Sequence, residues 1–140
     1  MGRTILGAVT GLVVAFITIM LVEFASHQAY PPPPDLDPMI TEDMVQIMAS
    51  MPLGAMLLVA LAWLIGAFDG GLVAAMVAGR NRPRIAAVVP ALMVMAGVLG
   101  MIVTMPQHPL WMSVVGLLLP IPMALAGAAL ATRIRPATKA

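Results

Sequence analysis

The sequence predicts an all-α integral membrane protein: a four-helix bundle with an outer interfacial amphipathic helix. Of its 140 residues, 61% are hydrophobic and only 9% are charged, and the mean hydropathy is +1.03. Soluble domains carry about 25% charged residues, so the lipid bilayer is the expected surrounding. The apolar residues also gather in four runs, each long enough to cross a bilayer as a helix.

We expect residues 1–140 to form a single transmembrane domain with four spans. A hydrocarbon core of about 30 Å needs about 20 apolar residues as helix, and open strands would leave backbone groups unpaired in lipid. The predicted spans cover about residues 4–26, 53–78, 84–105 and 110–132. The first run is longer than the apolar region of a signal peptide, so we expect the chain to retain it.

The basic residues predict the orientation. All Lys and Arg residues lie near the N-terminus, in the loop 79–84 or in the tail 133–139. With four spans these three places share one side, which the positive-inside rule assigns to the cytoplasm. We predict a multi-pass protein of the bacterial inner (plasma) membrane with both termini cytoplasmic. The net charge of +1 indicates no nucleic-acid partner.

The outer connection at residues 27–52 is predicted to hold the interfacial helix. Residues 30–34, YPPPP, form a stiff polyproline stretch. Asp37 followed by Pro38 is typical of a helix N-terminus. Beyond it, apolar residues recur at helical spacing and polar residues take the other face, the pattern of an amphipathic helix on a membrane surface. The apolar set, expected to face lipid, is Ile40, Met44, Ile47, Met48 and Met51.

Ionisable residues near the outer face form the first candidate site. Glu23 and His27 are four residues apart and can touch, and Tyr30 follows on the same helix face. His108, the only other histidine, is predicted on the same side of the membrane. Glu23, His27 and His108 would suit a divalent metal such as Zn²⁺, although no dedicated ligand spacing predicts a cofactor. Alternatively they handle protons or a polar ligand, or Glu23 and His27 simply pair and Tyr30 is an interface aromatic.

Asp69 is the second candidate, near the middle of the second span. A charged Asp there costs about 2.5–3.5 kcal/mol, so we expect it to face the bundle or a wet cavity. One interpretation is a polar staple, a hydrogen bond from Asp69 to a neighbouring helix. Another is that Asp69, Gly70 and Gly71 break the helix and line a small site. Gly66, Gly70 and Gly71 also form small-x-x-x-small patterns that favour close helix packing.

Sulfur appears only in methionine. The chain has no Cys, which excludes disulfides and thiolate chemistry, and fourteen Met. Thioethers bind Cu(I), but Met also fills apolar surfaces well, and no methionine motif stands free in a polar loop. We therefore favour packing. Many lie toward the predicted outer half: Met39, Met44, Met48, Met51, Met101, Met105 and Met112.

Three short patterns resemble those of small, mostly uncharacterised four-helix bacterial inner-membrane proteins. They are E-x-x-x-H-x-x-Y-P at 23–31, W-x-x-G-x-x-x-G-G at 63–71 and H-P-x-W at 108–111. The resemblance implies the same topology and a cluster of Glu23, His27 and His108 near the outer face. It implies no activity.

The function expected from these residues is non-enzymatic. We expect a small membrane protein that binds a small hydrophobic ligand or a membrane-protein partner, or that associates with itself, in a binding, accessory or assembly role. The glycine faces of the second span support helix association. One alternative is a small transporter or channel using Asp69 and Glu23. The other is an outer-face metal or catalytic site at Glu23, His27 and His108, which no known catalytic motif supports.

Overall fold

The computed structural model describes residues 1–80, 82–105 and 108–134, which form six helices and no strand. Four membrane-length segments are apolar enough to cross a bilayer: α1, α3, α4, and α5 with α6. The all-α prediction with four spans is confirmed. The helices are α1 (Gly2–Ala29), α2 (Thr41–Ser50), α3 (Leu53–Ala78), α4 (Pro83–Thr104), α5 (Leu110–Leu118) and α6 (Pro120–Ile134).

The helix bounds follow the predicted spans closely, with one division. The second span matches α3, while α1 begins and ends a few residues beyond the predicted limits. The fourth span divides into α5 and α6 between Leu118 and Pro120, because proline lacks the amide hydrogen and crowds the preceding turn. Arg135 and Lys139 of the basic tail lie outside the described residues.

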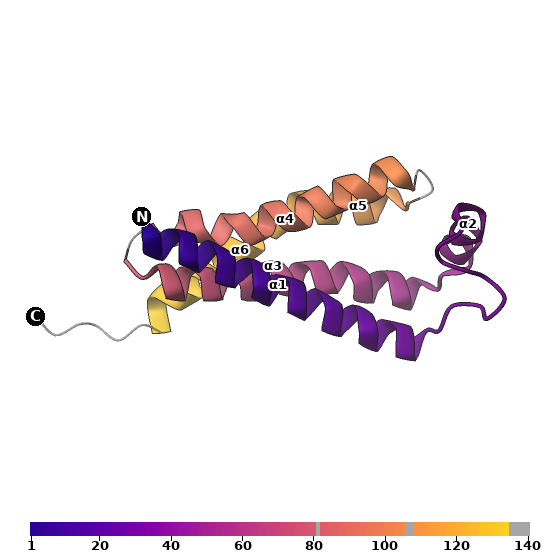
Figure 1. Ribbon diagram of the computed structural model, residues 1–140, viewed down its shortest axis with the longest axis horizontal. Helices are drawn as coiled ribbons and strands as arrows, with labels where there is room; N and C mark the ends of the chain where they lie inside the picture. Colours follow the sequence, from indigo (N-terminus) through magenta and orange to yellow (C-terminus); the bar gives the residue numbers. More distant parts are fainter. Residues whose placement is uncertain (81, 106–107, 135–140) are drawn as a thin grey trace, which may run out of the picture.

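Helix α3 is the central element. It packs against α1, α4, α5 and α6. Figure 1 shows α1 lying beside α3, and the α4–α5 arm separating from this pair toward the end where α2 lies. The N-terminus and the end of α6 lie at the opposite end. The molecule is therefore closely packed at one end and divided into two arms at the other.

Glycines allow the close packing around α3. A Cβ at Gly70 would lie 2.7 Å from the Gly11 carbonyl oxygen, and one at Gly66 would lie 2.7 Å from a side-chain carbon of Ile19. Gly71 faces the other neighbour, where a Cβ would run into the backbone of Ala124 in α6. The predicted packing glycines therefore serve contacts inside this chain.

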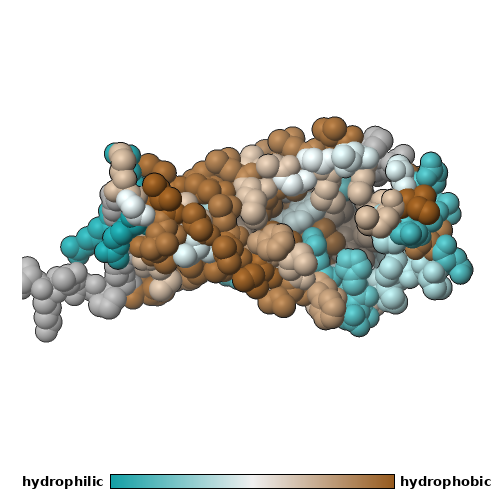
Figure 2. All heavy atoms as spheres, viewed as in Figure 1, coloured by the Kyte–Doolittle hydropathy of each residue, from teal (hydrophilic) through white to brown (hydrophobic). Residues whose placement is uncertain are grey.

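The molecular surface divides into an apolar belt and two polar ends. Figure 2 shows brown apolar side chains over the middle of the molecule and teal polar ones toward its ends. Every basic residue in the described part of the chain lies at the end where α3 joins α4, and all are exposed: Arg3, Arg80, Arg82, Arg84 and Arg133. Acidic residues of the 35–43 segment lie at the α2 end.

The predicted helix start at Asp37 is wrong, since α2 begins at Thr41. The Asp37 carboxylate instead accepts the N–H of Met39 at 2.8 Å, and the Asp37 carbonyl accepts the N–H of Ile40 at 3.0 Å. An Asp side chain that bonds two residues ahead stabilises a turn and competes with helix. Residues 37–40 therefore form a turn before the helix.

The apolar side of α2 meets protein. Ile47 is buried and lines a cavity described below. Met44 and Met48, expected to face lipid, are half-buried and line a groove with Thr104 and Met105 at the end of α4. Helix α2 thus borders a cavity and a groove at the open end of the two arms, and its backbone does not closely approach another described helix.

Candidate functional site

An outer cavity of about 200 Å³ lies where α1, the polyproline stretch, α2 and α3 meet. It lies at the α2 end of the molecule, away from the arginines. Its lining is mostly apolar, with a few hydroxyl and imidazole groups. The lining residues are Ser26, His27, Tyr30, Pro31, Pro32, Pro33, Ile47, Ser50, Met51, Pro52, Ala55 and Val59.

Local sequence features build the walls of this cavity. The N–H of Tyr30 donates to the Ser26 carbonyl at 2.8 Å and ends α1. Prolines follow, and they contribute no backbone donors to the wall. The Tyr30 ring then lies against Gly54, where any Cβ would collide with its hydroxyl group. The Ser50 hydroxyl donates to the Ile47 carbonyl at 3.0 Å, so this polar group is satisfied within α2.

His27 is held by the main chain of its own helix. Its Nδ1 lies 2.8 Å from the backbone carbonyl oxygen of Glu23, so Nδ1–H donates to that oxygen. Glu23 and His27 are close along the helix, as predicted, but the hydrogen bond goes to the Glu23 backbone rather than to its carboxylate. The His27 side chain is exposed and borders the outer cavity.

His108 lies in a different place, on the α4–α5 arm. Its side chain is only 9% exposed, and its ring stacks on Trp63 of α3 with centroids 6.1 Å apart and planes at 22°. Nδ1 lies 3.2 Å from the Ser113 hydroxyl, and Nε2 is buried without a partner in the described part of the chain. Burial lowers the pKa of His108, and a hydrogen bond to the Pro109 backbone partly opposes this effect. The imidazole is therefore neutral at pH 7.

The structure does not bring the three predicted metal ligands together. Nowhere in residues 1–80, 82–105 and 108–134 do three His, Cys, Asp or Glu side chains come close enough to hold a metal ion. His27 borders the outer cavity, whereas His108 borders a groove with Ile102, Ser113 and Val114 between α4 and α5. The two arms carry the two histidines, and they separate toward the outer end. The prediction relied on the two histidines lying on the same side of the membrane, and this does not bring their loops into contact.

Asp69 takes neither of the two predicted roles. Helix α3 runs without a break through Asp69, Gly70 and Gly71, because both glycines pack closely against α1 and α6. No hydrogen bond from the Asp69 carboxylate to another described residue is present, so the polar staple is not formed. Asp69 is half-buried. Ala62 and Met76 lie seven residues before and after it on the same side of α3, and Ala62 is fully buried whereas Met76 is exposed. Asp69 therefore lies between the buried and the exposed faces of α3.

Sequence reasoning missed two groups of residues. The first is Trp63, which forms the ring beneath His108. No sequence signal connects two positions so far apart. Gly7 and Gly11 of α1 lie against Ala74 and Gly70 of α3. Their four-residue spacing repeats the small-x-x-x-small pattern, which would have identified them.

Comparison with known proteins provides no relative from which to carry over a function. The chain matches no family model, no curated protein and no solved structure. The function is therefore inferred from the geometry of the cavity and side chains described above.

Proposed function

We propose that this protein is a non-enzymatic membrane binding protein that takes a small apolar ligand in the outer cavity. The observation that carries the proposal is the cavity itself, about 200 Å³ with a mostly apolar lining. An apolar cavity of about 150 Å³ is large enough to bind benzene, whereas drug-sized ligands occupy about 300–1,000 Å³. The expected ligand is therefore a compact hydrophobic molecule of one or two rings.

The packing of α3 favours a small ligand over a helical partner. Gly66, Gly70 and Gly71 were expected to support association with another membrane protein or a second copy. In this chain they lie against α1 and α6, so these faces are already covered. A partner or second copy would have to use other surfaces.

The orientation is part of the same proposal. All described arginines lie at the end opposite α2, and by the positive-inside rule that end is cytoplasmic. The cavity then faces the outside of the inner membrane, the periplasm of a bacterium. A ligand would reach it from the outer interface, where apolar molecules concentrate.

The two alternative functions have less support. Transport requires a polar path, and neither Asp69 nor Glu23 lines the outer cavity or the two grooves described above. A catalytic or divalent-metal centre at Glu23, His27 and His108 requires a cluster that the described residues do not form.

The test is photolabelling of the protein in lipid nanodiscs with a naphthalene-sized diazirine probe. We expect adducts to concentrate on peptides that contain residues 26–33 and 47–59, above the level on lipid-facing segments. Val59→Phe should fill the cavity from α3 and remove these adducts. Ser50→Phe should do the same from α2 without entering the bundle.

Leu57→Phe is the matched control, since Leu57 is an exposed residue two positions from Val59 on the same helix. It should leave the labelling pattern unchanged. Adducts spread evenly over all lipid-facing positions, or adducts that persist in both filling variants, would contradict a binding role for this cavity.

A further inference from the structure

A buried nitrogen atom on His108 has no partner. The side chain is 9% exposed, and the hydrogen bond between Nδ1 and the Ser113 hydroxyl orients the ring. Nε2 is shielded and makes no hydrogen bond to any described residue. Leaving a buried polar atom unpaired costs about 1–3 kcal/mol, so such an atom in a folded protein calls for an explanation.

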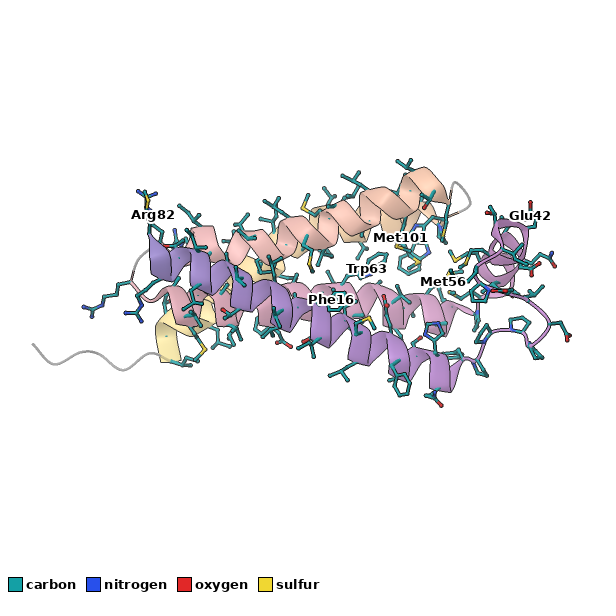
Figure 3. The ribbon with its side chains drawn as sticks, viewed as in Figure 1. Phe16, Glu42, Met56, Trp63, Arg82 and Met101 are labelled. Atoms are coloured by element: carbon teal, nitrogen blue, oxygen red, sulfur yellow. The ribbon has the colours of Figure 1, made fainter. Side chains whose placement is uncertain are left out.

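Methionines belong to, or pack against, the buried group that contains Trp63, the ring on which His108 stacks. Trp63 belongs to a buried group with Ala67, Val94, Val98 and Met112, here called the Trp63 cluster. Met112 is 2% exposed, and Met56 and Met101 pack against the cluster from α3 and α4. Figure 3 shows Met56, Trp63 and Met101 pointing into the space between α3 and the α4–α5 arm. The sequence spreads these methionines over 57 positions, from 56 to 112, and the fold gathers them.

The donor types in this space select the class of ion. Thioethers are soft ligands that bind Cu(I), and neutral imidazole also suits copper. Divalent ions such as Mg²⁺ and Ca²⁺ prefer carboxylate oxygens, and no group of three acidic or imidazole side chains is present among the described residues. The indole face of Trp63 offers further stabilisation to a cation. An imidazole binds a metal in its neutral form.

Further methionines line a groove near His108. Met44 and Met48 of α2 line a groove with Met105 at the end of α4. The carbonyl of Met105 accepts the backbone N–H of His108 at 3.0 Å, so the groove and the imidazole meet at one short loop.

We propose that the protein binds one soft monovalent cation, Cu(I), through Nε2 of His108 and the thioethers of Met101 and Met112, with Met56 nearby and the ion against the Trp63 ring. This site does not depend on the ligand proposed for the outer cavity, although the two share one wall residue: Val59 lines that cavity and packs against the Trp63 cluster. It uses one of the two histidines that the sequence suggested for metal binding, but with sulfur partners and a different ion.

The test is an anaerobic Cu(I) titration of the full chain in detergent against bathocuproine disulfonate, a chelator that sets the free Cu(I) level. The chain has two Trp residues, so a Trp111→Phe background leaves Trp63 as the sole indole reporter. We expect one equivalent of Cu(I) to bind and to quench Trp63 fluorescence. His108→Phe keeps a stacked ring and removes both nitrogens. It should weaken binding by at least about 100-fold, beyond the 10–100-fold typical of losing a supporting residue.

Met101→Leu and Met112→Leu test the sulfur ligands, since Met-to-Leu exchanges usually cost less than about 1.5 kcal/mol of stability. Each should weaken Cu(I) binding, and the double variant should weaken it further. Met20→Leu is the matched control, because Met20 is exposed on α1, and it should bind as the wild type does.

Wild-type affinity in His108→Phe, or equal affinity in the Met101/Met112 double variant and Met20→Leu, would overturn the proposal. If His108→Phe does not fold, the methionine variants decide the question. Loss of Cu(I) binding with unchanged probe labelling of the outer cavity would separate this site from the proposed function.

Discussion

The carboxyl group of Asp69 lies near the middle of α3, between the buried and the exposed faces of the helix, and it makes no hydrogen bond to another described residue. The sequence predicted that this residue would be compensated by a neighbour or by a break in the helix. Neither compensation is formed, so Asp69 weakens the insertion of α3 unless it serves an activity.

Replacing Asp69 with leucine should stabilise the protein. On insertion scales Asp and Leu near a helix centre differ by about 3 kcal/mol, and because Asp69 lies off-centre we expect a gain of about 2 kcal/mol in the free energy of unfolding. Equilibrium unfolding in mixed micelles measures this gain, with Asp69→Asn expected to fall between. A loss of stability in Asp69→Leu would instead show that the carboxyl group makes a stabilising contact.

At the scale of helices, α3 is held by backbone approach on two faces. Gly66 and Gly70 lie against α1, and Gly71 lies against the Ala124 backbone of α6. These contacts explain why the helix continues through Gly70 and Gly71. Two adjacent glycines weaken an isolated helix by about 1 kcal/mol each, but here each one permits a close helix–helix contact.

Gly71→Ala should separate α3 from α6. The added Cβ meets backbone atoms of Ala124, which cannot rotate away, and overpacking of this kind costs about 1–3 kcal/mol. Gly97→Ala is the control, because a Cβ there meets nothing within 4 Å, and better helix propensity should stabilise it by up to about 1 kcal/mol. Thermal unfolding in detergent compares the two. Equal effects would contradict the assignment of Gly71 to the α3–α6 contact.

For the molecule as a whole, the polar ends and the apolar belt define how it sits in a bilayer. The described arginines lie at one end and the acidic 35–43 segment at the other. Exposed aliphatic side chains cover the middle, a surface composition that suits a bilayer core rather than water. The direction of insertion then follows from charge rather than from packing.

Single-cysteine labelling tests that direction, since the native chain has no Cys to interfere. With the arginine end inside, Pro33→Cys should react with a membrane-impermeant maleimide in intact cells whose outer membrane is permeabilised. Arg80→Cys should react only after the inner membrane is opened. The reverse pattern would place the outer cavity and the Trp63 cluster on the cytoplasmic side.

The candidate sites were only partly predictable from the sequence. The local pair of His27 and Glu23 was expected from a four-residue spacing, although the hydrogen bond runs to the backbone. The stacking of His108 on Trp63 joins residues 45 positions apart, and helical periodicity says nothing about which faces of two helices meet. The helix start predicted at Asp37 was also wrong. An Asp side chain can stabilise either a helix N-terminus or a turn, and here it forms a turn.

The sequence by itself determined that the chain is helical, that four segments are long and apolar enough to cross a membrane, and where along the chain the arginines lie. These properties follow from hydropathy and charge along the chain, which act residue by residue. Only the tertiary structure decided that the two histidines lie on separate arms, that the glycines of α3 are used internally and that methionines pack against the Trp63 cluster. Such contacts depend on how far each helix turns and tilts against its neighbours, and that is set by packing among side chains far apart in the sequence.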